Sequence, residues 1–141
     1  AYGNRARERA DLDQYDAALK DYDLALKYDP NNAIDYNGRG YLLHKMKRYD
    51  EALNDYNTAI RQNSSIGNAY MNRGTTYETL GLYEDAVRDW ERQIEIEGAS
   101  RVEWWQEITK KYGGHYTGPI DGVYGQSTRD AITACARDPN C

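Results

Sequence analysis

Apolar and polar positions in the first hundred residues recur at one fixed interval. Tyr2, Tyr36 and Tyr70 are spaced 34 residues apart, and five further series keep the same spacing. These series are Tyr15, Tyr49 and Tyr83; Tyr22, Tyr56 and Trp90; Ala18, Ala52 and Ala86; Arg5, Arg39 and Arg73; and Asp21, Asp55 and Asp89. A period of this length is typical of stacked helical hairpins, in which each repeat packs against its neighbours.

The residue pattern within each repeat predicts two helices joined by a tight turn. Asn32 can cap the first helix of the second repeat, and Gly81 is expected in a left-handed conformation just past a helix end in the third. Asp29-Pro30 closes the first repeat. The predicted helices span residues 2–12, 15–28, 33–46, 49–62, 68–80 and 83–96.

Composition changes this picture little. The chain has no Phe and few large aliphatic residues, which alone would favour disorder, but 14 Tyr and 3 Trp supply apolar area. Its net charge is −5 and no dense Lys/Arg stripe is visible, so nucleic acid is not an expected partner. No apolar run approaches the roughly 18 residues that span a bilayer, so no membrane span is expected.

The second repeat carries small and aromatic residues where two helices must cross closely. Tyr36, Gly40, Ala52, Tyr56 and Ala59 occupy these positions, and the pattern resembles the tetratricopeptide repeat family. The resemblance implies an all-α fold, a right-handed α-α superhelix of three hairpins. They would span residues 1–32, 33–66 and 67–98, with a small helical module over residues 99–141. Departures from the family pattern are Ser64 and Gly98 in place of Pro, and Gln93 in place of Ala.

Members of this family bind extended peptides in a groove lined by the first helix of each hairpin. By resemblance, the groove residues are Gly3, Arg7, Ile34, Asn37, Tyr41, His44, Asn68, Met71, Thr75 and Glu78. Family members that clamp a chaperone's C-terminal carboxylate use a Lys/Asn/Arg set, and the corresponding places here hold Gly3, Arg7, Gly38, Asn68 and Asn72. That partner class is therefore not predicted. The alternative is a repeat stack that serves only as a spacer.

The Arg and Asp series share one period and carry opposite charge. Arg5, Arg39 and Arg73 are predicted to pair with Asp21, Asp55 and Asp89 across each hairpin. The functional alternative is a row of arginines that binds anions.

From about residue 101 the period stops and a Gly-rich segment follows. Ser100 and Glu103 form a capping box that predicts a helix to about Tyr112, and one of Trp104 and Trp105 can close the third repeat. Turn residues dominate positions 113–125, where three side chains are expected to anchor the loop inward, and Ser127 is expected to cap a last helix. The three predicted anchors are Ile120, Val123 and Tyr124.

This segment also resembles the peptidoglycan-binding domain attached to many cell-wall hydrolases. The resemblance rests on Gln106, Gly114, Tyr116, Gly118, Ile120, Asp121, Gly122, Tyr124, Gly125, Thr128, Ala131 and Ile132. It implies that Tyr116 and Tyr124 could stack on sugar or stem peptide, while Thr117, Thr128 and Arg129 offer hydrogen bonds. The alternative places both tyrosines in the core and makes Asp121 the acceptor of its own loop amides.

Two cysteines, Cys135 and Cys141, could form a small disulfide loop or remain free thiols. No sequence motif for a catalytic centre, metal site or cofactor is found, and His115 with Cys135 lacks an orienting third group. The expected function is a non-catalytic adaptor of a bacterial periplasm or other extracytoplasmic space. It would hold a protein or peptide in the groove and could bind peptidoglycan. The alternatives are a scaffold whose last 40 residues only cap the repeats, and a regulatory fragment of a larger enzyme.

Overall fold

The computed structural model describes residues 1–141 as eight α-helices without a β-strand. Their bounds are α1 Tyr2–Asp11, α2 Tyr15–Tyr28, α3 Ala33–Lys45, α4 Tyr49–Gln62, α5 Gly67–Thr79, α6 Tyr83–Glu97, α7 Ala99–Lys111 and α8 Gln126–Ala136. The all-α fold class is confirmed. None of these helices combines the length and the apolar composition needed to cross a membrane.

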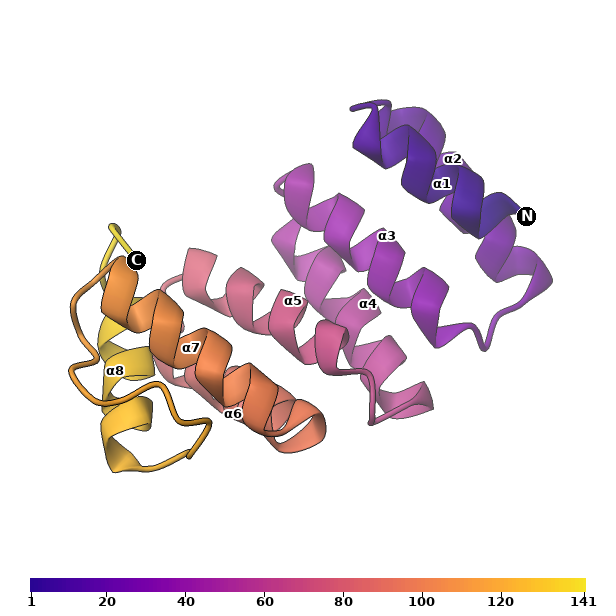
Figure 1. The fold of residues 1–141 in the computed structure, drawn as a ribbon. Coiled ribbons are helices and arrows are strands. Elements are labelled where there is room, and N and C mark those ends of the chain that lie inside the picture. The colour runs from indigo at the N-terminus through magenta and orange to yellow at the C-terminus, as the bar shows by residue number, and fades with distance from the viewer. The chain divides into compact units, whose positions relative to one another are not determined.

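The chain divides into two compact units, which are described separately. Unit 1 comprises residues Ala1–Thr76 and unit 2 comprises residues Tyr77–Cys141. In unit 1, α1 packs on α2 and α3 packs on α4, while α2 also contacts α3 (Figure 1). The first two predicted hairpins are therefore present, and they are consecutive neighbours.

Small residues allow the hairpins of unit 1 to close. A Cβ atom at Gly40 of α3 would lie 2.7 Å from a ring carbon of Tyr56 on α4, closer than real Cβ contacts come. Ala52 and Tyr56 are fully buried in this crossing, and Leu19 of α2 packs against the same cluster. The core thus combines large rings with small residues, as the composition predicted.

Buried ion pairs join the two helices of each hairpin in unit 1. Arg5 of α1 donates to both carboxylate oxygens of Asp21 at 2.8 and 2.7 Å, and Arg39 of α3 does the same to Asp55 at 2.7 and 2.8 Å. The Asp21 side chain is 2% exposed. Hydrogen bonds from Arg5 hold the pKa of Asp21 below its usual value. The predicted pairing is confirmed for the first two repeats.

Tryptophan rings organise unit 2. Trp90 of α6 and Trp105 of α7 are buried with ring centroids 4.8 Å apart. This contact confirms that one of the two adjacent tryptophans closes on the last repeat. Trp104 instead lies under the guanidinium of Arg101 at 5.1 Å. Gln93, which replaces the family's alanine, is fully buried and donates to Glu97 at 3.0 Å.

Two predicted helix caps are wrong. Helix α7 begins at Ala99 with Gly98 as its N-cap, and no side chain caps it. Gly98 adopts a positive φ of 75°, and the N-cap therefore lies two residues before the Ser100 that the capping box implies. Helix α8 likewise begins at Gln126 after Gly125, which leaves Ser127 inside the helix.

The predicted inward anchors of the loop between α7 and α8 are also wrong. Ile120, Val123 and Tyr124 are exposed, with Val123 at 64%. The interior of the loop is filled by a polar side chain, Gln106 of α7, so the backbone and Asp121 face inward instead.

The buried ion pair of the second hairpin can be tested with a neutral isostere. Asp55→Asn removes the charge that Arg39 needs, and we expect the free energy of unfolding of unit 1 to fall by about 2 kcal/mol. Asp23→Asn is the matched control, because Asp23 also contacts Arg39 at 2.9 Å but is 58% exposed; its cost should stay below about 0.5 kcal/mol. Native-state hydrogen exchange of the α3 and α4 amides measures both. Equal losses in the two variants would contradict the assignment.

Candidate functional site

A groove of about 560 Å³ lies on unit 1 and gathers residues from four helices. Helices α1, α2, α3 and α5 contribute, with Ile66 preceding α5. The lining residues are Arg7, Ala10, Asp11, Tyr22, Ile34, Asn37, Gly38, Tyr41, Ile66, Asn68 and Asn72. Five residues predicted for the peptide groove therefore lie together, namely Arg7, Ile34, Asn37, Tyr41 and Asn68.

Two asparagine side chains form a hydrogen-bonded pair in this groove. Asn72 of α5 donates from Nδ2 to Oδ1 of Asn37 on α3 at 3.1 Å. The pair leaves both amide hydrogens of Asn37, and the amide oxygen and second amide hydrogen of Asn72, for other partners. An extended backbone offers one acceptor and one donor for each residue, so this pair has the complementary groups. The sequence analysis named Asn72 only as a residue that stands where the clamp-type relatives have a different side chain, and it did not predict this contact.

Apolar surface lies beside the amide pair. Ile34 is 60% exposed and Tyr41 is 44% exposed, whereas the Tyr22 ring is buried. Both side chains line the same groove. The groove can therefore bury an apolar side chain next to a polar backbone.

The charges of the groove come from Arg7 and two aspartates. Arg7 is exposed and makes no ion pair, and Asp11 lies one helical turn further along α1. Burial raises the pKa of Asp35, the charge of Asp29 adds to this, and Arg7 opposes it. Burial also raises the pKa of Tyr22, again opposed by Arg7. Arg7 is thus close to acidic groups without being neutralised by one.

Two glycines explain why the chaperone-type clamp is absent. A Cβ atom at Gly3 would collide with the carboxylate of Asp35, and one at Gly38 would collide with the hydroxyl of Tyr22. Tyr22 is buried and its ring has little room to move. A side chain at position 38 would therefore meet the buried Tyr22, whereas one at position 3 would require the Asp35 carboxylate to move.

The other predicted groove residues lie outside the lining. His44 of α3 contacts Thr76 of α5 through Nδ1 at 2.8 Å, and Thr76 donates its hydroxyl to Asn72 O at 3.0 Å. Since that hydroxyl proton is used, Nδ1 of His44 must be the donor, and burial lowers the pKa of this imidazole. Thr75 donates to the Met71 carbonyl at 3.0 Å.

Glu78 belongs to a different pocket, within unit 2. That pocket of about 420 Å³ is lined by Glu78, Thr79, Tyr83, Ala136, Arg137, Asp138 and Pro139. Burial raises the pKa of the Glu78 carboxyl. Arg137 in its wall is already paired with Glu84 at 2.8 Å.

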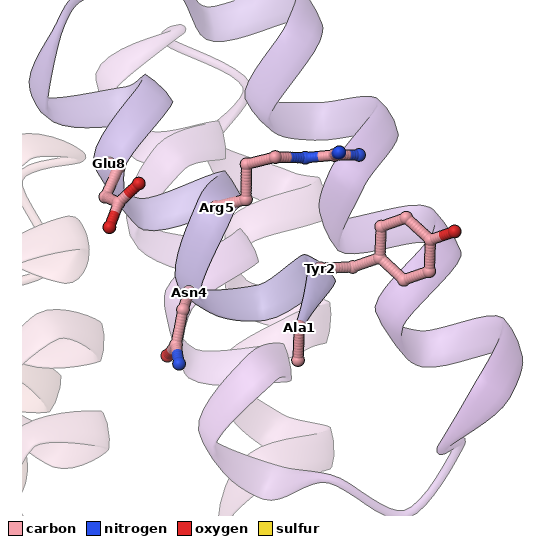
Figure 2. Close-up of a pocket in the computed structure, with 5 residues that line it drawn as sticks. All are labelled: Ala1, Tyr2, Asn4, Arg5 and Glu8. Carbon is pink, nitrogen blue, oxygen red and sulfur yellow. The ribbon is translucent and has the colours of Figure 1, made fainter.

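A further pocket lies at the start of α1 and is a less convincing candidate for a binding site. It encloses about 480 Å³ and is lined by Ala1, Tyr2, Asn4, Arg5 and Glu8. Figure 2 shows Tyr2 and Arg5 extending to one side of the helix, while Asn4 and Glu8 point elsewhere. Because Arg5 is also bonded to Asp21, these groups do not converge on one point.

Gln106 of α7 is the centre of unit 2. Its Nε2 donates to Asp121 Oδ1 at 2.9 Å and to the Tyr116 hydroxyl at 3.0 Å. Its Oε1 accepts the backbone amides of Asp121 and Gly122 at 3.1 and 3.2 Å. Gln106 is fully buried, as are Tyr116 and Thr128 to within a few per cent. Two of the candidate glycan-binding residues therefore hold the loop in place.

The remaining glycan candidates lie on the surface. Arg129 donates to Glu91 of α6 at 2.7 Å, and the hydroxyl of Tyr124 donates to the same carboxylate. Burial and Glu91 raise the pKa of Tyr124. Thr117 is exposed. Asp121 accepts a hydrogen bond from the backbone amide of Val123 at 3.0 Å, which confirms the expectation that Asp121 is an acceptor for its own loop.

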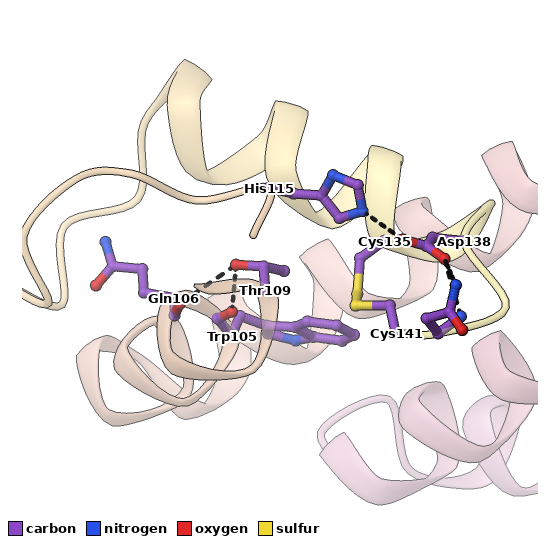
Figure 3. Close-up of a disulfide and its surroundings, with 8 residues drawn as sticks. Trp105, Gln106, Thr109, His115, Cys135, Asp138 and Cys141 are labelled. Carbon is purple, nitrogen blue, oxygen red and sulfur yellow. Dashed lines mark hydrogen bonds and ion pairs between the residues drawn. A yellow bond between two sulfur atoms is a disulfide. The ribbon is translucent and has the colours of Figure 1, made fainter. Parts of the chain in front are cut away.

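Cys135 and Cys141 are joined by a disulfide at the end of α8 (Figure 3). Within the closed loop, Asp138 bonds Nε2 of His115 at 3.0 Å. The imidazole is therefore paired with a carboxylate rather than with a thiol. No group of three or more His, Cys, Asp or Glu side chains in the chain could hold a metal ion.

The role of Gln106 can be tested by fluorescence, because all three tryptophans lie in unit 2. Gln106→Leu leaves the Asp121 carboxylate and two loop amides without their partner, and we expect a loss of at least about 3 kcal/mol in the free energy of unfolding. Gln126→Leu on the exposed start of α8 is the control and should change it by less than about 0.5 kcal/mol. Urea titration followed by tryptophan emission compares them. A stable Gln106→Leu variant would refute the central role.

The disulfide is tested by thiol titration and by reduction. Denatured but unreduced protein should show no titratable thiol, and dithiothreitol should lower the free energy of unfolding of unit 2 by about 2 kcal/mol, the entropy of one short closed loop. The double variant Cys135→Ser, Cys141→Ser should match the reduced protein and no longer respond to the reductant. Two titratable thiols in the unreduced protein would contradict the disulfide.

Comparison with known families finds repeats in the first two thirds of the chain. The model described as TPR repeat matches residues 6–47, and two models described as Tetratricopeptide repeat match residues 33–65 and 67–99. No curated protein matches the chain. No comparison supports the resemblance of residues 101–136 to a peptidoglycan-binding domain.

Solved structures are similar over the same part of the chain. The first TPR of Spaghetti (RPAP3) bound to the HSP90 peptide SRMEEVD is 28% identical with a TM-score of 0.66, over 68% of this chain and 76% of that one. The first TPR domain of human RPAP3 gives the same values. The second TPR domain of human RPAP3, in complex with the HSP70 peptide SGPTIEEVD, is 27% identical with a TM-score of 0.64, over 69% and 81% of the two chains.

Proposed function

The chain contains tetratricopeptide repeats between residues 6 and 99, and we propose that it is a non-catalytic interaction module that holds an extended peptide in the groove of unit 1. Protein–protein interaction is the typical work of such repeats, and several similar structures carry bound peptides. Beyond this general role, we propose that the peptide binds in the groove of unit 1 and that named side chains of this groove contact it.

The observation that carries the proposal is the Asn37–Asn72 pair next to exposed apolar surface. The pair presents a donor and an acceptor to one groove, and a peptide backbone is the common ligand that needs both. Ile34 and Tyr41 lie in the same lining and can bury one apolar side chain of that peptide. Backbone bonds would supply affinity, and the apolar contact would supply part of the selectivity.

The peptide differs from those bound in the similar structures. Asp35 lies beside Gly3 and the buried Tyr22 lies beside Gly38, and neither glycine supplies a donor side chain at its clamp place. The groove also has a single cation, Arg7. An HSP90-type or HSP70-type C-terminal peptide would therefore find too few charged donors here.

Unit 2 has a structural role in this proposal. Trp105 covers Trp90 on the last repeat helix, and Gln106 holds the following loop. Peptidoglycan binding and an extracytoplasmic location stay predictions from the sequence. Co-sedimentation with insoluble peptidoglycan tests the first, with Tyr124→Ala as the variant because Tyr124 is an exposed candidate outside the Gln106 network.

Groove binding is tested with linear peptides selected against the intact chain from a random display library. Asn37→Ala removes one half of the amide pair, and we expect the affinity for a selected peptide to fall about tenfold, the effect of one or two lost hydrogen bonds. Asn54→Ala on α4 is the control, because Asn54 is exposed outside the groove. Fluorescence anisotropy with the labelled peptide measures both variants. Equal affinity in wild type and Asn37→Ala would contradict binding at this pair.

A further inference from the structure

We propose that the peptide in the groove carries an acidic side chain within its sequence and that Arg7 recognises it. This inference rests on the proposed function and names the chemistry of its ligand. It places a specificity-determining contact on α1, separate from the backbone contacts of the asparagine pair.

Arg7 differs from most other arginines of the chain in having no carboxylate partner. Nine arginines form ion pairs with aspartate or glutamate, namely Arg5, Arg9, Arg39, Arg48, Arg88, Arg92, Arg101, Arg129 and Arg137. In a chain of net charge −5, acidic partners are abundant. Arg7 instead lines the groove without an ion pair, although Asp11 lies in the same lining and Asp35 interacts with its charge.

A carboxylate is the group that best fits this guanidinium. Arginine presents a planar fork of N–H donors that matches the two oxygens of a carboxylate. The ring hydroxyl of Tyr22 lies beside Arg7 and adds a neutral partner for the same ligand group. Asp11 and Asp35 carry charge near the guanidinium, so a second acidic residue of the peptide would be repelled there.

The acidic group belongs to a side chain and not to the peptide's C-terminus. Along the backbone path, Asn72 presents an amide oxygen beside its remaining N–H, and this combination of acceptor and donor suits a continuing peptide backbone better than a terminal carboxylate. Two of the five clamp places, Gly3 and Gly38, supply no side-chain donor, and the groups at the other three, Arg7, Asn68 and Asn72, are too few to surround a terminal carboxylate. The main chain therefore continues through the groove, and the charge that Arg7 binds extends sideways from it.

A charge-swap selection tests this inference on the intact chain. Random peptides displayed between fixed flanks are selected against wild type, Arg7→Gln and Arg7→Glu. We expect wild type to enrich Asp or Glu at one position, Arg7→Glu to enrich Lys or Arg at that position, and Arg7→Gln to show no charge preference there. Arg61→Glu is the matched control, since Arg61 is exposed on α4 and bonds only the hydroxyl of Thr58. It should select the same peptides as wild type.

Synthetic peptides then measure the size of the effect. An acidic peptide selected by wild type should bind Arg7→Gln about tenfold more weakly, and the gap should shrink at high salt. Its affinity should be the same with a free or an amidated C-terminus. Circular dichroism confirms that each variant is folded.

The outcomes separate the two proposals. Identical enriched peptides for wild type and Arg7→Glu would overturn recognition by Arg7 and leave groove binding intact. Dependence of affinity on a free C-terminal carboxylate would overturn the assignment to a side chain. Failure of every chain to enrich any peptide would overturn the proposed function itself, and this inference with it.

Discussion

In each of the first two hairpins, the pairing of an arginine with a buried aspartate decides which side of the first helix meets solvent. Arg5 is drawn back onto Asp21 of α2, and Arg39 is drawn back onto Asp55 of α4. Residues two positions apart on a helix point about 200° apart. Arg7, two positions after Arg5, therefore points away from Asp21 and toward the groove, and Asn37 and Tyr41 point away from Asp55 in the same way. The groove is the side of α1 and α3 that the ion pairs leave free.

The ion pairs also explain how a chain with little aliphatic surface holds its hairpins together. Burying a carboxylate is costly unless its oxygens are bonded, and each arginine satisfies both oxygens at once. Arg5 and Arg39 additionally lie over Tyr2 and Tyr36, at 5.1 and 5.6 Å from the ring centroids. Tyrosine, arginine and aspartate thus act as one contact that recurs with the repeat, which is why these three series share its period.

Structural features that recur in successive repeats could be predicted from the sequence, whereas features that occur only once in the chain could not. The helix ends of the first two repeats and the Arg–Asp pairs follow from local patterns seen more than once. Gln106 appears only once, and its six hydrogen-bonding contacts connect α7 with residues 10 to 22 positions away. No periodicity marks such a residue. The expectation that Ile120 and Val123 face inward was wrong because it assumed an apolar interior.

The groove was predicted in part for a related reason. The family resemblance named Arg7, Ile34, Asn37, Tyr41 and Asn68, and these five line one groove because their positions depend only on the phase of each helix. Whether a side chain at the right phase is available depends on its neighbours in space. His44 has the right helical phase, but its Nδ1 is already hydrogen-bonded to Thr76. Asn72 contributes to the groove through its hydrogen bond to Asn37 on another helix.

The same dependence on neighbours gives the groove its chemical character. Internal carboxylates occupy most arginines of the chain, and Asp35 and Tyr22 occupy the places where further donors could stand. The groups that remain toward the groove are one guanidinium, one amide pair, two exposed apolar side chains, Asp11 and Asn68. In the proposed peptide site, selectivity would depend on this remaining set, so a change at Tyr22 or Asp35 should alter the preferred ligand as a change at Arg7 should.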